Sequence, residues 1–185
     1  ILDMAGLVVK EKVRLELAQK SPLGQPAQEH GLVHVDVRLV DDVLDEQPRG
    51  ARDAGVEKFV VIGTDAETSA AAIAIAQDHP DVWATVGLHP HDATNGVDSI
   101  VSYIASPKVV AIGECGLDYY YDHSPRDIQI NSFRQQIALA KQHDLTLVIH
   151  TRDAWDDTFK VLDSEGMPAN TIIHCFTGGP EEARK

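Results

Sequence analysis

Cysteine is scarce in this sequence. Its 185 residues contain only Cys115 and Cys175, too few for a disulfide framework, and both fall in strand-like segments, where a buried and reduced thiol is the usual state. Residues 1–20 alternate charged with aliphatic residues and lack the uninterrupted apolar stretch of a secretory signal. No apolar run approaches the ~20 residues that a membrane span requires. We therefore expect a cytoplasmic protein with no membrane partner.

Positive charge is also scarce. Lys and Arg total 16 against 29 Asp and Glu, which gives a formal net charge of -13. This balance argues against broad, charge-driven adhesion to nucleic acid or to anionic membranes. A phosphate-bearing substrate would need a local source of positive charge at its binding site, and a bound divalent cation is the obvious one. The 43% hydrophobic and 24% charged residues are ordinary for a globular chain with one core, and we expect a monomer.

Short apolar runs alternate with amphipathic stretches from residue 57 onward, which predicts strands and helices in βαβα order. The runs begin near Phe59, Val82, Val109, Leu145 and Thr171. Because they are apolar on both alternating faces, they are typical of parallel strands that are covered on both sides. Earlier in the chain, residues 31–40 are a candidate first strand and residues 41–54 a candidate first helix.

Helix boundary signals accompany these runs. Thr64 with Glu67 has the spacing of a capping box and predicts one helix start. Ser124 followed by Pro125 predicts a second, as a cap and a first-turn residue, and Gly166 predicts the end of a third. After the second start, apolar residues recur at helical spacing and are expected to face the core: Ile130, Phe133, Ile137 and Ala140.

Polar residues follow four of the apolar runs: His89, Glu114, His150 and His174. The carboxyl ends of parallel strands meet at one edge of the sheet, where ligands bind. A single histidine after a strand is more often a hydrogen-bonded packing residue. Four such residues together favour a metal site, because each is costly to bury unless it is paired or metallated. Imidazole nitrogen and carboxylate oxygen suit Zn or Mn, and Mg if more oxygen ligands join.

Three further residues are expected near the same edge. His91 either contacts substrate or shapes its loop. Asp118 is expected to order its own loop through side-chain to backbone hydrogen bonds, with substrate contact as the alternative. Arg152 could place its guanidinium on a phosphate or form a structural ion pair. The remaining histidines considered are expected to be solvated: His30, His79, His123 and His143.

Four segments together resemble the TatD family of metal-dependent hydrolases, within the amidohydrolase superfamily of TIM-barrel enzymes. They are VGLHPHDA (86–93), VVAIGECGLDYYYDHSP (109–125), LVIHTRDAWDD (147–157) and IIHCFTGGPEEA (172–183). The resemblance covers about residues 31–185. It implies an α/β TIM barrel in that region, incomplete and with about six βα units, after an N-terminal extension of unknown structure at residues 1–30.

The resemblance implies one or two divalent metal ions (Mg, Mn or Zn). Glu114 would bind or bridge them, and His150 and His174 would be ligands. His89 would act through metal or substrate. The candidate catalytic residues are Glu114 and His89, on the resemblance, and Arg152, on its possible contact with a phosphate. His91 and Asp118 are the candidates for substrate binding.

The first strand departs from the family pattern. Many members carry a His-x-His pair there, whereas the nearest counterpart here is His34-Val35-Asp36. His34 and Asp36 are therefore candidate metal ligands of a more weakly held ion.

The implied activity is that of a deoxyribonuclease, exonucleolytic and acting on DNA strand ends through metal-activated water. The family places an Asp after its last barrel strand, and this sequence stops at Lys185 before such a segment. A complete TIM barrel takes ~250 residues, so we expect a fragment or a lost C-terminal quarter, and reduced activity. Two alternatives stay open: a catalytically silent metal-binding scaffold, and a hydrolase of a non-nucleic-acid ester or amide.

Overall fold

Six parallel strands form one sheet with the order β1-β2-β3-β4-β5-β6. The structure is a computed structural model that describes residues 32–36, 52 and 55–185. The strands are β1 (Leu32–Asp36), β2 (Lys58–Ile62), β3 (Val82–Val86), β4 (Val109–Asp118), β5 (Thr146–Arg152) and β6 (Thr171–Ile173). The helices are α3 (Ala66–Asp78), α4 (Asp98–Val101), α5 (Arg126–His143) and α6 (Trp155–Glu165), with short 3-10 helices η2 (Pro90–Asn95) and η3 (Glu182–Arg184).

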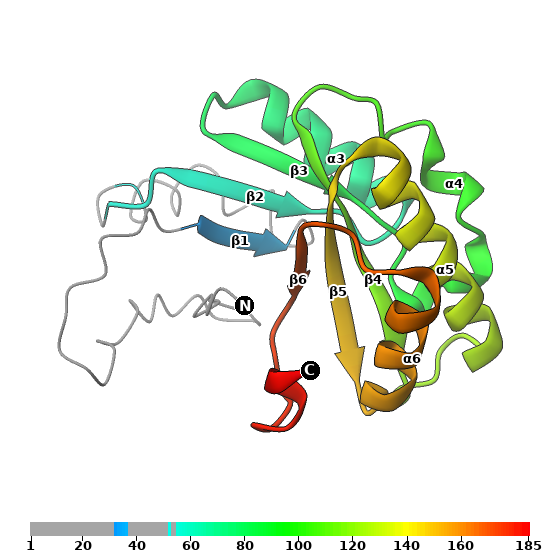
Figure 1. Cartoon of the computed structure of the whole chain (residues 1–185). Helices are drawn as coiled ribbons and strands as arrows, with labels where there is room; N and C mark the ends of the chain where they lie inside the picture. Colours follow the sequence, from blue (N-terminus) through cyan, green and yellow to red (C-terminus); the bar gives the residue numbers. More distant parts are fainter. Residues whose placement is uncertain (1–31, 37–51, 53–54) are drawn as a thin grey trace, which may run out of the picture.

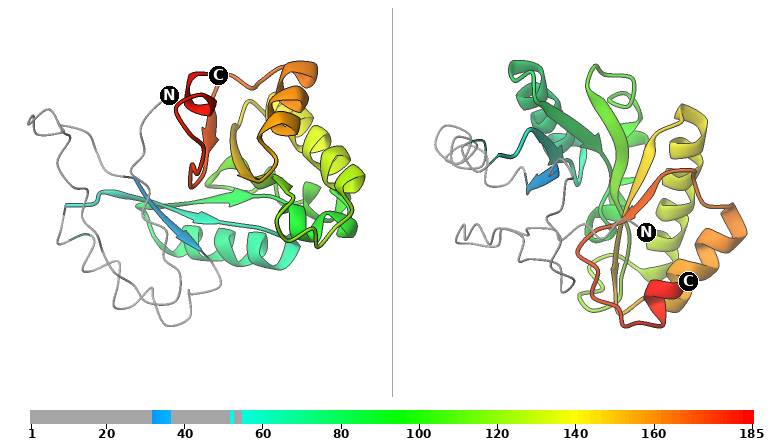
Figure 2. Two further views of the ribbon diagram at one scale, coloured as in Figure 1. Left: turned by 90° about the horizontal axis from the view of Figure 1, so that it is seen from below. Right: turned by 60° about the vertical axis from the view of Figure 1, so that its left-hand side comes forward.

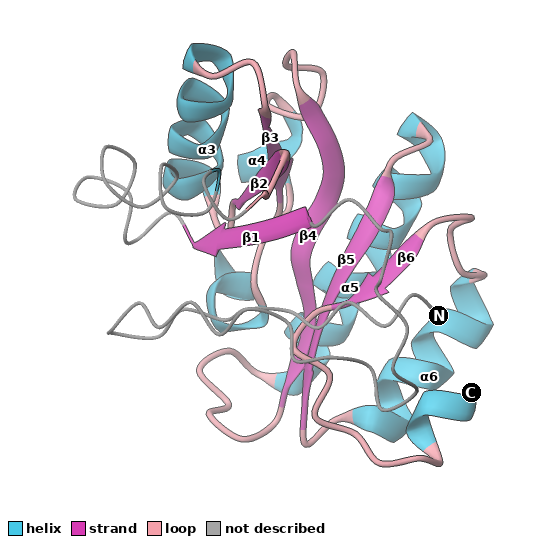
Figure 3. Cartoon of the chain, turned by 90° about the vertical axis from the view of Figure 1, so that its left-hand side faces the viewer, coloured by secondary structure: helices cyan, strands magenta, loops and turns pink. Residues whose placement is uncertain are grey.

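The sheet is curled, and helices α3 to α6 lie on its outer side (Figures 1 and 2). Coloured by secondary structure, the strands alternate with helices along the chain from β2 onward (Figure 3). This arrangement confirms the predicted α/β fold of the TIM-barrel type, with all five later strands and β1 at the expected places. The predicted extension at 1–30 and the predicted helix at 41–54 lie outside the described residues, apart from single positions.

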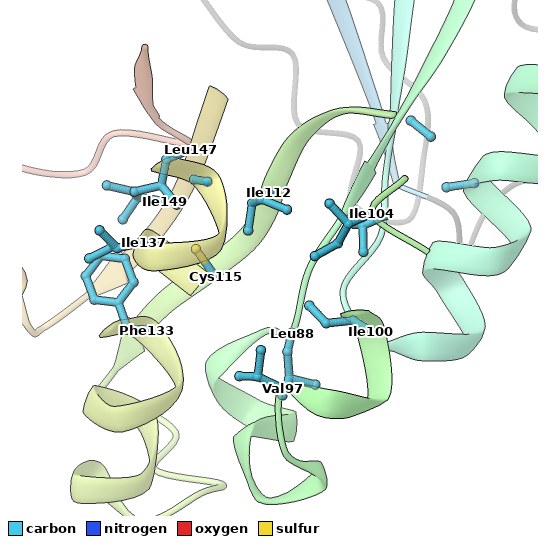
Figure 4. Packing of buried hydrophobic residues seen from close by; sticks show 14 of the residues in the cluster. Leu88, Val97, Ile100, Ile104, Ile112, Cys115, Phe133, Ile137, Leu147 and Ile149 are labelled. Carbon is cyan, nitrogen blue, oxygen red and sulfur yellow. The ribbon is translucent and has the colours of Figure 1, made fainter. Parts of the chain in front are cut away.

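The core lies between the sheet and its outer helices. Phe133 and Ile137 of α5 pack toward Leu147 and Ile149 of β5 (Figure 4), and all four side chains are fully buried. The helical spacing of the apolar residues therefore places one face of α5 against the sheet, as predicted. Among the described residues no helix is long and apolar enough to cross a membrane.

The first predicted helix start was wrong by one residue. Asp65, not Thr64, caps α3, and its partner in the capping box is Thr68 rather than Glu67. Asp65 Oδ1 accepts the backbone N–H of Thr68 at 2.7 Å, and Thr68 Oγ1 accepts that of Asp65 at 2.9 Å. The carboxylate of Asp65 is a stronger acceptor than the hydroxyl of Thr64 for the free N–H groups in the first turn of α3.

The second predicted cap was also wrong. Helix α5 has no side-chain cap at its start, because Ser124 is fully buried and its hydroxyl donates to the backbone carbonyl of His91 at 2.8 Å instead. Ser124 thus ties the start of α5 to η2. The predicted stop of α6 at Gly166 is confirmed, with a positive φ of 75° and a hydrogen bond from its N–H to Leu162.

Strands β4 and β5 are longer than the sequence predicted. Glu114 and His150 were expected to follow their strands, but both lie inside them. Strand β4 also bulges here: the pairing passes from Ile112 with Leu147 to Cys115 with Ile149, so one extra residue stands on β4. The backbone N–H of Glu114 bonds the carbonyl of Gly63 at 2.9 Å. A bulge of this kind re-aims the side chain that it carries.

Candidate metal centre

Glu114 lies at the centre of a group of imidazoles. Its Oε1 is 2.8 Å from Nδ1 of His174 and 3.3 Å from Nδ1 of His150. One ligand atom each of His89, Glu114 and His150 lie within 4.8 Å of one another, as ligands of one ion must. The structure thus brings together the four residues that the sequence singled out at the strand ends.

Each side chain of this group is held by backbone contacts. His89 follows β3, and its N–H bonds the carbonyl of Thr64 at 2.8 Å. His174 follows β6, and its N–H bonds the carbonyl of Ile149 at 2.8 Å, which places it beside His150. Strands β4 and β6, on either side of β5, therefore bring residues that are 60 positions apart, Glu114 and His174, into hydrogen-bond contact.

Glu114 stays ionised although it is buried. Burial raises the pKa of this carboxyl, but hydrogen bonds from His150 and His174 outweigh it and hold the pKa well below its ordinary value. Burial lowers the pKa of His174, and contacts with Cys175 and Glu114 outweigh it and raise that pKa to about 10. A metal ion needs a neutral imidazole, so it would displace this proton.

His89 is neutral in the site. Burial lowers the pKa of its imidazole to about 3, with the nearby His150 and His91 acting in the same direction and Glu114 opposing them. Its Nδ1 accepts the backbone N–H of His91 at 3.2 Å. In that arrangement the ring carries its proton on Nε2. His89 can therefore offer a hydrogen bond from Nε2, or a ligand atom there only if the proton moves to Nδ1 and the contact with the backbone of His91 is lost.

Asp118 connects the metal-binding candidates to the next loop. Its Oδ2 lies 3.0 Å from Nε2 of His91 and 3.0 Å from Nε2 of His150. Its Oδ1 accepts the backbone N–H groups of Tyr120 and Tyr121 at 3.0 and 2.9 Å. The carboxylate does order its own loop, and it also orients His150 so that Nδ1 faces Glu114. A carboxylate behind an imidazole is a common support of metal-binding histidines.

The donor set fits a divalent cation. It combines an ionised, buried carboxylate with imidazole nitrogens, one of which is backed by Asp118. Such mixed oxygen and nitrogen donors are typical of Zn and Mn sites. The strand β1 that carries His34 and Asp36 pairs with β2, but their side chains lie outside the described residues, so their part in metal binding stays a prediction.

Arg152 reaches the same edge of the sheet, paired in register with Asp118. The sequence left open a phosphate contact or a structural ion pair. Its guanidinium instead lies over two aromatic rings, 4.0 Å from the centroid of Tyr120 and 4.8 Å from that of Tyr121. His123, expected to be solvated, is exposed but packs against the rings of His91 and Tyr121.

Cys175 departs from its prediction. It was placed in a strand with a buried thiol, but it follows β6 and is exposed, whereas Cys115 is buried in β4 as expected. Its Sγ lies 3.1 Å from Nε2 of His174. The short β6 ends at Ile173, so the chain turns away from the sheet before Cys175 can enter it.

Two buried glutamines of α5 were missed by the sequence reasoning. Gln129 accepts the N–H of Asp118 at 2.8 Å and donates to its carbonyl at 3.2 Å. Gln136 does the same for Leu88, next to His89, at 2.8 and 2.9 Å. Their seven-residue spacing on one helix face was the only signal in the sequence. The pattern of the sequence also predicted no role for the tyrosine run at 119–121.

Comparisons with known proteins identify the family of the chain. The family model described as TatD related DNase matches residues 32–185. An uncharacterized metal-dependent hydrolase, YabD of Bacillus subtilis, is 42% identical over 157 residues, which are 82% of this chain and 62% of that protein. A 3'-5' ssDNA/RNA exonuclease, TatD of a Rahnella species, is 40% identical over 139 residues, 71% of this chain and 52% of that protein.

Solved structures show the same likeness. The crystal structure of YJJV, a TatD homolog from Escherichia coli K12, superimposes with a TM-score of 0.73 at 28% identity, over 83% of this chain and 62% of that one. A TatD family hydrolase from Entamoeba histolytica gives a TM-score of 0.67 at 25% identity, over 74% of this chain and 50% of that one. The present chain thus spans between half and two thirds of the length of these relatives.

Proposed function

The chain belongs to the TatD family, and on that premise we propose that it is a metal-dependent hydrolase that cleaves phosphodiester bonds of DNA from strand ends. One observation carries the proposal: the buried, ionised Glu114 in contact with His150 and His174. The name of the Rahnella relative supports a nucleic-acid substrate. A cytoplasmic location, a monomeric state and membership of the amidohydrolase superfamily remain predictions.

We assign the metal ligands to Glu114 and His150, whose ligand atoms lie within 4.8 Å of each other, and to His174, which contacts Glu114. His89 lies beside them as a hydrogen-bond donor. A divalent ion bound there would lower the pKa of a water molecule and neutralise charge on phosphate oxygens. Mg, Mn and Zn all remain candidates, because the donor set includes both oxygen and nitrogen. The low pKa of Glu114 keeps a negative ligand available across the neutral range.

The other side chains have roles of their own in this proposal. His89 donates from Nε2 to a phosphate oxygen, since its Nδ1 is occupied by the backbone of His91. Asp118 holds the rings of His91 and His150 in place, and His91 lines the substrate side. Arg152 brings positive charge to an acidic chain of formal net charge -13, which would otherwise repel a polyanion.

The test is metal binding and hydrolysis by matched variants. Glu114→Gln keeps the shape of the side chain but removes the charge, and it should weaken Mn²⁺ or Zn²⁺ binding at least tenfold by titration calorimetry. Glu67→Gln makes the same change at an exposed position and should bind as the parent does. Single-stranded DNA labelled at either end then reports cleavage and its direction. Equal metal affinity in all three proteins would contradict the assignment of Glu114.

A further inference from the structure

Two exposed tyrosines and an arginine form a surface beside the candidate metal centre. Tyr120 and Tyr121 are 58% and 46% exposed, although aromatic residues make up only 5% of the sequence. The guanidinium of Arg152 lies over both rings, at 4.0 and 4.8 Å from their centroids. We call these three residues the tyrosine-arginine platform.

The platform is fixed relative to the metal-binding candidates by one carboxylate. Asp118 is 1% exposed, and its Oδ1 holds the backbone of Tyr120 and Tyr121 while its Oδ2 contacts His91 and His150. Groups bound to opposite oxygens of one buried side chain cannot move independently. Asp118 therefore fixes the position of the platform relative to His91 and His150.

The ring of His91 lies between the tyrosine-arginine platform and His89 of the candidate metal centre. The ring of His91 lies 5.4 Å from that of Tyr121 and 4.3 Å from that of His89, centroid to centroid. One imidazole thus separates the platform from His89. The ring of Tyr121 also stacks on that of His123 at 5.5 Å, so Tyr120, 58% exposed, offers the more open ring to a ligand that extends from the metal centre.

Arg152 differs in its contacts from other arginines of the chain. Arg52, Arg126 and Arg134 each pair with a carboxylate, at 2.7, 2.7 and 3.2 Å. Across residues 55–185 no ion pair is found for Arg152, whose recorded partners are the two tyrosine rings. Its charge is therefore not neutralised locally, in a protein where negative charge prevails.

We propose that the tyrosine-arginine platform binds the unpaired base and adjoining phosphate at the end of a nucleic acid strand, with the base stacked on tyrosine and the phosphate near Arg152. The inference rests on the proposed function, because it supplies a subsite for the same substrate. Every base has an aromatic face, so such stacking accepts any sequence. A base within a duplex is stacked and paired, so the platform favours single-stranded ends over blunt ones.

The experiment measures binding rather than turnover. The probe is a short single-stranded DNA with the fluorescent base 2-aminopurine at one end, and its partner carries an abasic nucleotide there. Affinities are measured at low salt without added metal, by quenching for the first and by competition for the second. Since stacking on an aromatic ring strengthens the binding of each base, we expect the parent chain to prefer the base-bearing probe by about tenfold.

Two double variants test the tyrosine rings, and one single variant tests the charge of Arg152. Tyr120→Ala with Tyr121→Ala should abolish the preference, whereas Tyr120→Phe with Tyr121→Phe should keep it, because the rings remain. Arg152→Gln should lower the salt dependence of binding by about one phosphate contact. Thermal unfolding of each variant excludes misfolding as the cause of a loss.

The outcomes separate this inference from the proposed function. Equal affinity of the parent for both probes, or an unchanged preference in the alanine variant, would overturn the platform even if the chain binds metal and cleaves DNA. A clear preference that the alanine variant loses would support it. The proposed function is tested separately, by the metal affinity of Glu114→Gln: an affinity equal to that of the parent would contradict it.

Discussion

The side-chain amide of Gln136 makes two hydrogen bonds to the backbone of Leu88, as a neighbouring strand would. The amide accepts the backbone N–H of Leu88 at 2.8 Å and donates to the backbone carbonyl at 2.9 Å. Both residues are fully buried. Helix α5 thereby holds the segment after β3 that carries His89, although 48 positions separate the two residues.

Replacing Gln136 with Leu should destabilise the protein and weaken metal binding together. The substitution leaves the N–H and C=O of Leu88 buried without partners, and each such group costs ~1–3 kcal/mol. Urea unfolding should show a loss of about 2 kcal/mol or more. Gln135→Leu is the matched control, because Gln135 is the exposed neighbour on the same helix. A similar loss in both variants would contradict the assignment of the loss to the buried amide of Gln136.

Replacing Gly116 with Ala should displace His150. Gly116 pairs with His150 across β4 and β5, has a positive φ of 137°, and a Cβ there would overlap the carbonyl oxygen of His150. We expect a Tm several degrees lower and metal affinity reduced at least tenfold. Gly96→Ala shares the positive φ, at 78°, but its Cβ would meet nothing within 4 Å. That control should show only the backbone cost, ~1–2 kcal/mol.

Tyr119 should make the protein less stable at high pH. Burial, followed by the hydrogen bond that its hydroxyl donates to Asp157 at 3.0 Å, raises the pKa of Tyr119 to about 12. An unfolded tyrosine ionises near ~10, so between these values the unfolded state binds fewer protons and stability falls as pH rises. Below pH ~10 the contribution is complete.

Urea unfolding across that window checks the sign. Tyr119→Phe should flatten the loss of stability above pH ~10, and Asp157→Asn should lower the pKa of Tyr119 in a spectroscopic titration of tyrosinate. An identical alkaline slope in Tyr119→Phe and the parent would contradict the prediction.

Divalent metal should stabilise the folded chain. An ion that binds only the native state adds ~2.7 kcal/mol when its concentration is 100 times its Kd. We therefore expect Mn²⁺ or Zn²⁺ to raise the Tm, chelator to reverse the rise, and Glu114→Gln to remove it. Persistence of the full rise in Glu114→Gln would place the ion elsewhere.

The order of strands and helices could be read from the sequence because it depends on local patterns. Apolar runs marked β2 to β6, and the spacing of Phe133 and Ile137 marked the buried face of α5. The polar residues at the strand ends could be singled out for the same reason, since parallel strands share an edge. The predicted cap at Thr64 was wrong because the neighbouring Asp65 caps α3 instead, and the one at Ser124 was wrong because its hydroxyl bonds the distant carbonyl of His91.

What the sequence by itself determined is therefore the α/β order and the group of residues around Glu114. Only the tertiary structure decided the bulge that turns Glu114 inward, the two amides of α5 that hold the site loops, and the stacking of Arg152 on Tyr120 and Tyr121. These features join residues distant along the chain, and hydrogen bonds and ring contacts depend on distances of a few ångströms that no local pattern encodes.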